Sequence, residues 1–533
     1  MVAGCWILPA WNHPFNDDWS YGFIAKTFLE TGKIEFINWG EPILVSHLAW
    51  GALFARLFGF SFTSLQLSVL VLSAAGGIFF YLILKLLNIP RFLSLAGAAL
   101  LVVNPVYFTN SFSYMTDSVF VSETLMALYF YLASSGKKRA GFSLLSGFFS
   151  VLAFSNRQFA LVLPVAMGIH LLVSGTTWKQ KRILFLCAGI LPVLADAFIF
   201  FWHRSLPNVP IRSLGIQPAV FYCRAVFLMI LYAGFFSMPV VLPWMLSPTH
   251  RSRLNARVKP VFQLGALAAG VAALCLMPVK TMPLLGNNIT RFGMFESDEL
   301  LPGGRFDLFP RPFWIAATAL TLISTAFLVF MIAEAVRSRI QPLRVKRPGS
   351  VLKALFSTPA SVVGLASFFL FLCPLVIGSL FDRYTVMFLP GVFLAALKAY
   401  SDHPRGQALI ASGLLLFSVF TIILVFDTVG WNRIRWREAE RLVREGVSPM
   451  HIDAGVEWCG WYAKKPFPAG YRRAPKPYYV SWYLRDCFDS IDNRYAVSFS
   501  GLNGFSVLRT VRYRTVFWKT DPFLYVLKRN ASD

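Results

Sequence analysis

The sequence predicts a polytopic α-helical membrane protein that ends in a small α/β domain. Hydrophobic residues make up 56% of the 533 residues and charged residues only 14%, which is far from the balance of an ordinary soluble protein. Apolar runs long enough to cross a bilayer recur between residues 64 and 426. After Phe426 the composition changes to Trp, Tyr, Arg and Pro without another such run. We therefore divide the chain into a transmembrane domain, 1–426, and a C-terminal domain, 427–533.

The chain is strongly basic, with 50 Lys and Arg against 26 Asp and Glu and a net charge of +24. In a soluble protein this excess would suggest a nucleic-acid partner. Here most basic residues fall in short connectors between apolar runs, where cytoplasmic retention of positive loops and anionic head groups account for them. The expected partner of the basic surface is the lipid bilayer, and no nucleic acid is expected.

The membrane spans are inferred from apolar runs bounded by polar connectors. Residues 1–11 are apolar but about half as long as a span requires, so we expect a truncated first helix and a true N-terminus upstream of Met1. With this remnant, about thirteen transmembrane helices are expected. The complete spans are placed at 64–87, 92–109, 118–134, 140–154, 158–174, 183–202, 219–246, 259–279, 313–336, 354–380, 385–400 and 406–426.

Two adjacent carboxylates, Asp17 and Asp18, lie just outside the first apolar segment, in an aromatic-rich polar loop at 12–63 that carries short amphipathic pieces. A carboxylate within the hydrocarbon is costly, whereas one just beyond the apolar edge stays ionised and can meet a lipid head group. We interpret Asp17 as a catalytic base. A solvated loop start explains these two residues equally well when they are taken alone.

Basic clusters fall in every second connector, at 137–139, 179–182, 251–257 and 337–353, which places those connectors in the cytoplasm. The 12–63 loop, a large loop at 280–312 and the C-terminal domain then face outward. Taken singly, an arginine at a span edge is an interfacial anchor. A shared outer face for acids and arginines favours a site instead, and its members are Asp17, Asp18, Asp117, Arg157, Arg383 and Tyr384.

The C-terminal domain is expected to be a small mixed α/β unit on the outer face. An amphipathic helix is predicted over 431–445, with Glu438 and Arg441 spaced to pair, and β-prone pieces follow at 496–499 and 515–518. Cys459 and Cys487 are its only cysteines. An oxidising compartment would allow them to pair if their Cα atoms lie within about 7 Å, which leaves a disulfide open.

The motif Asp17-Asp18-x-x-Tyr21 in the first outer loop resembles that of the C-type integral-membrane glycosyltransferases, the superfamily of protein O-mannosyltransferases and bacterial aminoarabinose transferases (glycosyltransferase family 39-like). Two departures are visible: relatives often carry glutamate at the position of Asp18, and a basic residue with two prolines where this chain has Gly40, Glu41 and Pro42. The resemblance covers roughly residues 12–400, and further pieces agree in order at 25–32, 39–42, 104–117, 156–158 and 381–390.

The resemblance implies transfer of a sugar, with inversion, from a polyprenyl-phosphate carrier to a lipid, glycan or protein acceptor on the outer face of a bacterial inner membrane. It implies that Asp17 is the base and that Asp18 assists. Arginine has a fixed fork of donors that suits phosphate. The donor phosphate is therefore assigned to Arg157, Arg383 and Tyr384, with Lys280, Arg291 and Arg305 as substitutes. Asp117 is assigned to acid, acceptor or metal binding. A divalent cation stays open, and no other cofactor is expected.

The rival class is a transporter or lipid flippase, in which charges inside the membrane mark a pathway. Such proteins often contain inverted repeats, and we find no internal repeat. The ionisable residue Asp196 in the span at 183–202 is isolated in the sequence. We expect it to be an acid with a local partner rather than part of a proton relay.

Overall fold

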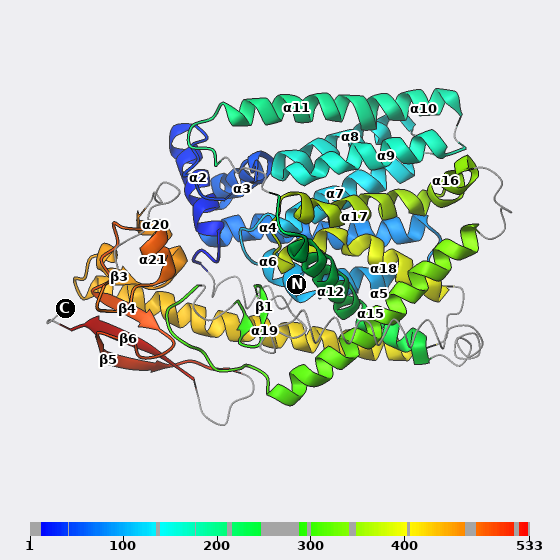
Figure 1. Cartoon of the computed structure of the whole chain (residues 1–533). Coiled ribbons are helices and arrows are strands. Elements are labelled where there is room, and N and C mark those ends of the chain that lie inside the picture. Colours follow the sequence, from blue (N-terminus) through cyan, green and yellow to red (C-terminus); the bar gives the residue numbers. More distant parts are fainter. Residues whose placement is uncertain are drawn as a thin grey trace.

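The computed structural model describes residues 12–40, 42–134, 139–175, 177–210, 216–246, 287–295, 300–340, 348–401, 406–463, 476–515 and 522–530. They form a bundle of long helices with a small α/β domain at one end (Figure 1). The expected N-terminal remnant, the expected span at 259–279 and the basic cluster at 251–257 lie outside the described residues, as do Lys137 and Lys138.

Six helical segments of the described residues are long and apolar enough to cross a membrane. A seventh would be a bent pair, α5 (Arg91–Val102) and α6 (Pro105–Ser111), whose axes differ by 65°. The expected number of about thirteen is therefore not confirmed. The six are α4 (Phe62–Leu86), α12 (Ala219–Leu246), α15 (Arg311–Ile340), α17 (Pro359–Val376), α19 (Gln407–Arg444) and a continuous stretch of α10 (Trp178–Phe185), η3 (Leu186–Ile190) and α11 (Leu191–Arg204).

The bend between α5 and α6 has a local cause. The side chain of Asn104 accepts hydrogen bonds from the backbone N–H groups of Val106 and Tyr107, at 3.0 and 3.2 Å. It thereby starts a new helix, and Pro105 occupies the first turn, where its missing N–H costs nothing. The expected span at 92–109 is thus two helices.

Shorter apolar helices occupy the remaining expected spans within the described residues. The central one is α7 (Asp117–Ala133), which is buried along most of its length and packs against α4 and α8. A 3₁₀ turn, η2 (Gln158–Leu161), links α8 to α9, and another, η5 (Asp382–Tyr384), precedes α18. The other members are α8 (Arg139–Asn156), α9 (Val162–Val173) and α18 (Thr385–Ser401). The short helix α16 (Pro348–Phe356) begins instead in the expected basic connector at 337–353.

The polar loop at 12–63 contains two regular helices, α2 (Asp18–Thr31) and α3 (Val45–Phe58). Helix α2 ends at Gly32, whose φ of 71° gives the left-handed turn that closes a helix without a Cβ clash. Figure 1 shows α2 running across the end of the bundle, beside the C-terminal domain. This position brings the paired acids to the helix ends.

The C-terminal domain is built on a four-stranded sheet in the order β3-β4-β6-β5. Strand β3 (Ile452–Asp453) is parallel to β4 (Tyr495–Ser498), whereas β6 (Phe523–Arg529) is antiparallel to both β4 and β5 (Phe505–Arg512). Two short helices, α20 (Val456–Ala463) and α21 (Trp482–Asp486), complete the domain. The predicted mixed α/β character is seen, and the strand expected at 496–499 is β4. Residues 516–518 of the other expected strand lie outside the described residues.

Cys459 and Cys487 are both free thiols, so the disulfide that the sequence left open is not formed in this structure. Cys459 is buried, and its Sγ lies 3.7 Å from the carboxylate of Asp453.

The expected helix at 431–445 is not a separate element. It is the end of α19, which runs unbroken for 38 residues from the bundle into the C-terminal domain. The change in composition after Phe426 marks where this helix leaves its apolar surroundings, not where it stops. Buried partners for the polar residues beyond that point, including an Arg305–Asp427 ion pair, allow the helix to continue. Glu438 and Arg441 lie 3.9 Å apart, as their spacing predicts.

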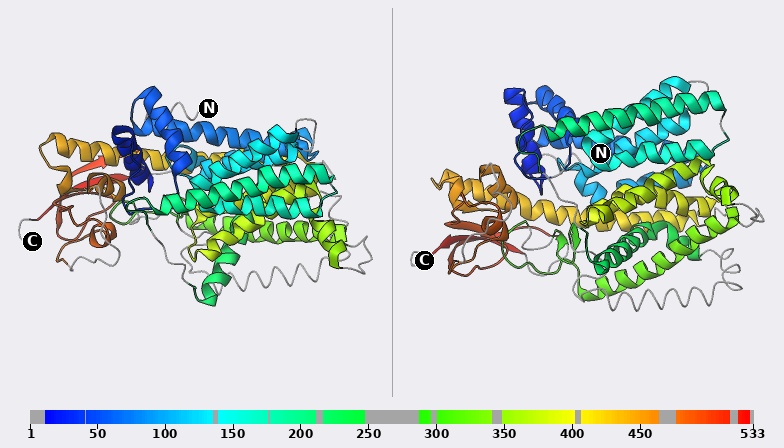
Figure 2. Two further views of the ribbon diagram at one scale, coloured as in Figure 1. Left: turned by 90° about the horizontal axis from the view of Figure 1, so that it is seen from above. Right: turned by 45° about the horizontal axis from the view of Figure 1, so that its top comes forward.

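The acids and arginines singled out from the sequence lie at the end of the bundle that carries the C-terminal domain. Helices α8, α10 and α16 contain residues of the expected cytoplasmic connectors, and their beginnings lie at the opposite end (Figures 1 and 2). The helices therefore separate a polar, domain-bearing end from a basic end.

Candidate active site

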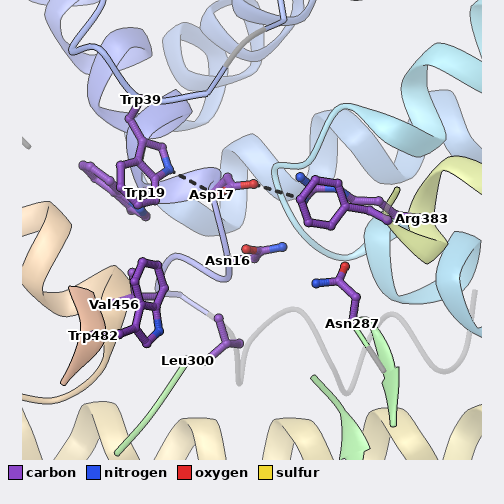
Figure 3. A pocket seen from close by; sticks show the side chains of 10 residues that line it. Asn16, Asp17, Trp19, Trp39, Asn287, Leu300, Arg383, Val456 and Trp482 are labelled. Carbon is purple, nitrogen blue, oxygen red and sulfur yellow. Dashed lines mark hydrogen bonds and ion pairs between the residues drawn. The ribbon is translucent and has the colours of Figure 1, made fainter. Parts of the chain in front are cut away.

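A cavity of about 220 Å³ lies between the loop that precedes α2 and the C-terminal domain (Figure 3). Both parts of the chain supply its walls, so the cavity exists only when the two are docked. Its lining residues are Asn16, Asp17, Trp19, Trp39, Asn287, Leu300, Phe381, Arg383, Val456 and Trp482.

Asp17 is held by a donor on each carboxylate oxygen. The indole Nε1 of Trp39 donates to Oδ1 at 3.1 Å, and Nη1 of Arg383 donates to Oδ2 at 3.0 Å. Asp17 also occupies the N-cap position of α2, where the helix dipole favours negative charge. Its side chain keeps 20% of its surface exposed, so a fixed carboxylate faces the cavity.

Asp18 faces the other way and does not line the cavity. It is fully buried, and its two oxygens accept hydrogen bonds from the backbone N–H groups of Phe15 and Tyr114, the latter at 3.1 Å. Burial raises the pKa of Asp18 well above the usual range of a carboxyl group. The side chain therefore ties the loop before α2 to the segment before α7.

Arg157 and Asp117 form a buried ion pair, with Nη2 of Arg157 3.1 Å from Oδ1 of Asp117. Nε of Arg157 also donates to Oγ1 of Thr116 at 2.7 Å. Asp117 is the first residue of α7, and Arg157 lies between α8 and η2, so two helix ends are joined here. Neither side chain lines the cavity.

Tyr384 connects the two arginines. Its ring centre lies 5.8 Å from the guanidinium of Arg157 and 5.9 Å from that of Arg383. The ring is buried and also meets Phe159 and Phe381 edge-on. The structure thus gathers the sequence-predicted residues at one end of the bundle, but only Asp17 and Arg383 reach the cavity.

Several residues of the cavity were not predicted as site residues. Trp39 belongs to a motif of the resemblance, but nothing in the sequence indicates that its indole donates to Asp17. Val456 and Trp482 come from the C-terminal domain and carry no motif.

Asp382, next to Arg383, does not line the cavity but accepts hydrogen bonds from the backbone N–H groups of Asn288 and Ile289, both at 2.8 Å. It thereby fixes the turn that carries Arg383. The sequence could have indicated this role, because Asp382 is an acid directly beside a predicted site arginine.

Of the substitutes for phosphate binding, Lys280 lies outside the described residues and the two arginines have other partners. Arg291 lies 3.1 Å from Asp307, and Arg305 is buried in its ion pair with Asp427. Asp196, in α11, is buried, and neither carboxylate oxygen has a hydrogen-bond partner among the described residues. The prediction that Asp196 has a local partner is therefore wrong within the described residues.

The acids of the described residues are not grouped as a divalent cation requires. The described residues contain no group of three or more His, Cys, Asp and Glu side chains that could hold a metal ion. Asp18 is used by backbone N–H groups and Asp117 by Arg157. Hard cations require several oxygen ligands at one point.

Comparison with solved structures gives matches of low similarity. ArnT from Cupriavidus metallidurans in the apo state is 16% identical, covers 100% of this chain and 97% of that chain, and has a TM-score of 0.41. ArnT bound to undecaprenyl phosphate gives 15% identity, coverages of 100% and 96%, and a TM-score of 0.39. The archaeal oligosaccharyltransferase AglB from Archaeoglobus fulgidus, in complex with an inhibitory peptide and a dolichol-phosphate, is 12% identical. The match covers 82% of this chain and 57% of that chain, with a TM-score of 0.40.

No curated protein matches this chain significantly. Residues 41–202, however, match the model of the family described as dolichyl-phosphate-mannose-protein mannosyltransferase. This segment includes both Asp117 and Arg157. The resemblance to the C-type membrane glycosyltransferases is thereby confirmed, and over residues 41–202 the chain is similar to this mannosyltransferase family.

Proposed function

We propose that the protein moves a sugar from a polyprenyl-phosphate carrier to a lipid, glycan or protein acceptor on the outer face of a bacterial inner membrane, with inversion. The observation that carries this proposal is the Asp17 carboxylate, fixed between Trp39 and Arg383 in the wall of a cavity at the ends of apolar helices. The matching family is named for a lipid-phosphate-linked sugar donor, which supports the donor class.

In this reaction the acceptor hydroxyl attacks the anomeric carbon on the face opposite the carrier phosphate. Asp17 accepts the hydroxyl proton as the new glycosidic bond forms. The bond from the anomeric carbon to the phosphate oxygen breaks, and the electron pair leaves with the carrier phosphate. The head group of the carrier stays at the membrane surface, so the base has to lie at the helix ends, as Asp17 does.

Arg383 is the best candidate for stabilising the leaving phosphate. Its Nη1 donates to Asp17, and its side chain lines the cavity with 12% of its surface exposed. A guanidinium has several N–H donors, so it can contact the base and the phosphate at once. Arg157 and Tyr384 would act from behind, by fixing the position of Arg383.

The cavity suits a single sugar ring. Pockets for drug-sized ligands span about 300–1,000 Å³, and this one is smaller. The rings of Trp39 and Trp482 offer apolar walls for the C–H face of a sugar, and the amides of Asn16 and Asn287 lie between them and Arg383 (Figure 3). Amides can exchange hydrogen bonds with sugar hydroxyl groups.

The outward orientation is supported by the distribution of charge. The C-terminal domain, which supplies Val456 and Trp482 to the cavity, lies at one end of the bundle, and α8, α10 and α16 begin at the other end with residues of the basic connectors. Positive connectors are retained in the cytoplasm, which would place the cavity outside.

The test is sugar transfer by the purified protein in proteoliposomes. Polyprenyl-phosphate sugars carrying a radiolabel are supplied with envelope lipids, glycans or peptides, and both the glycosylated product and the released carrier phosphate are measured. Asp17→Asn should lower the rate by about 10²- to 10⁴-fold, as expected for loss of a general base. Asp492→Asn is the matched control, because Asp492 also pairs with arginines but lies away from the cavity.

Parental transfer by a folded Asp17→Asn protein would contradict the assignment of the base. Translocation of intact donor across the bilayer, without consumption of the sugar, would instead identify a flippase.

A further inference from the structure

We infer that Glu457 of the C-terminal domain is a positioning residue for Asp17, so that this domain completes the active site. The inference rests on the proposed function only in naming Asp17 as the base. The contact itself joins residues 441 positions apart in the sequence.

The carboxylate of Glu457 holds two segments together. Its Oε1 accepts the backbone N–H of Asn16 at 2.9 Å, and its Oε2 accepts Nη1 of Arg435 at 2.8 Å. The side chains of Glu457 and Arg435 are fully buried. Arg435 also donates to the carbonyl of Leu300, a cavity residue, at 3.3 Å. One buried carboxylate thus links α20, α19 and the loop that carries the base.

The backbone of Asn16 explains why this link matters for Asp17. Asn16 has a φ of 58°, in the left-handed region that residues other than glycine adopt uncommonly. The N–H held by Glu457 belongs to this residue, directly before Asp17. A fixed peptide at Asn16 sets the direction in which the Asp17 side chain leaves the backbone.

The C-terminal domain also contacts Trp39, the residue whose indole donates to Asp17. The ring of Trp39, which donates to Asp17, stacks on Phe488 of the C-terminal domain with ring centres 5.7 Å apart. Trp19 packs against both Trp39 and Phe488, at 5.4 and 5.6 Å. A Cβ at Gly460 would lie 2.5 Å from the Trp19 ring, so α20 approaches α2 this closely because residue 460 is glycine.

The alternative is that the Arg435–Glu457 pair only stabilises the fold. Removing one partner of a buried pair destabilises a protein whatever its function. A positioning role adds two effects that stability alone does not give: a selective fall in kcat, and its recovery when the hydrogen-bond acceptor is restored.

The experiment compares Glu457→Ala with Glu457→Gln in the full chain, by the proteoliposome transfer assay. Glu457→Ala should lower kcat by about 10- to 100-fold, the effect of a base displaced by about 1 Å. The donor KM should stay within about two-fold, because binding groups such as Arg383 are untouched. Glu457→Gln should recover part of kcat, since its one amide oxygen can still accept the Asn16 N–H, although its NH₂ group then faces Arg435 and lowers stability.

Glu438→Ala is the matched control. Glu438 is also a buried glutamate of this region, paired with Arg509 at 3.0 Å, and it does not face the cavity. It should lose stability and keep kcat. Parental kcat in Glu457→Ala would overturn the inference, as would a folded Glu457→Gln protein that is as slow as Glu457→Ala.

Hydrogen exchange gives a readout that needs no activity. The peptide containing residues 14–20 should exchange faster in Glu457→Ala than in the parent, Glu457→Gln or Glu438→Ala. A parent without transfer activity would contradict the proposed function, whereas unchanged exchange would contradict the positioning role. Should Glu457→Ala fail to fold, Glu457→Asp decides, because it keeps the charge but withdraws the carboxylate: slower transfer supports the inference, and parental transfer overturns it.

Discussion

Arg383 and Asp17 form an ion pair of 3.0 Å across 366 positions of the sequence, and both side chains line the same cavity. The pair joins the loop before α2 to the turn before α18. Removing either side chain therefore leaves the other without its countercharge, and informative variants are those that change geometry while keeping charge.

Arg383→Lys is such a variant. Lysine can still pair with Asp17 as a point charge but has no second donor in a fixed fork. We expect kcat/KM for the polyprenyl-phosphate donor to fall by about ten-fold, near the value of one charged hydrogen bond. Arg291→Lys, in a half-exposed pair with Asp307, is the control and should transfer sugar at the parental rate. Equal donor kinetics in the two variants would remove Arg383 from donor binding.

Trp39→Phe keeps an aromatic ring for packing on Phe488 but removes the N–H that donates to Asp17. A hydrogen bond to a charged group contributes about 1.5–3 kcal/mol, so transfer should slow by about 10- to 100-fold if the bond fixes the base. The measurement is kcat at saturating donor, with the thermal unfolding midpoint as a check on folding. An unchanged kcat would mean that Arg383 alone orients Asp17.

Asp18→Asn should show the opposite pattern to Asp17→Asn. An amide at position 18 can accept only one of the two backbone N–H groups, and its own NH₂ would face the other donor. We expect a lower unfolding midpoint with a smaller loss of transfer, whereas Asp17→Asn should lose transfer by about 10²- to 10⁴-fold, far more than any change in its midpoint explains. A stable Asp18→Asn protein without activity would instead give Asp18 a direct role in the chemistry.

The pH dependence of stability should report Asp382. Burial raises its pKa from the ordinary value of 3.8 to about 6. The folded state thus binds this proton more tightly than the unfolded state. The stabilisation is complete below about pH 3.8 and is lost as the pH rises through about 6. Between these values the parental unfolding midpoint should fall more than that of Asp382→Asn, whose side chain stays neutral. Parallel curves would show that Asp382 does not titrate in this range.

Reporter fusions test the orientation. A reporter after Arg139 should be cytoplasmic, and one after Asp533 should be outside, so that the two give opposite signals. The same signal from both fusions would contradict the proposed outer position of the cavity.

The sequence was sufficient for features that depend on local pattern. Apolar runs located the long helices of the bundle. The alternation of charge between connectors predicted that Asp17, Asp117, Arg157 and Arg383 lie at the same end of these helices. The cap formed by Asn104 before Pro105 was also visible as a helix-start signal, but it was passed over, and a bent pair was predicted as one span.

Features that depend on tertiary contact could not be predicted in this way. Val456, Glu457 and Trp482 reach the cavity region because the C-terminal domain docks on α2, and no periodicity records such a docking. The prediction of a separate helix at 431–445 was wrong for a related reason, because these residues continue α19. Composition reports what surrounds a helix, and the helix continues wherever its polar residues find partners.

Because α19 is uninterrupted, its length sets the distance and the rotation of the C-terminal domain relative to the helix bundle. At about 1.5 Å per residue, its 38 residues span about 57 Å. One residue inserted between Phe426 and Arg435 would advance the domain by only about 1.5 Å but turn it by about 100°. Glu457 would then swing away from Asn16. The number of residues in this part of α19 therefore sets the rotation of the C-terminal domain about the helix axis. A single insertion here would break the contact with the loop before α2, so we expect changes in chain length to occur in the loops instead.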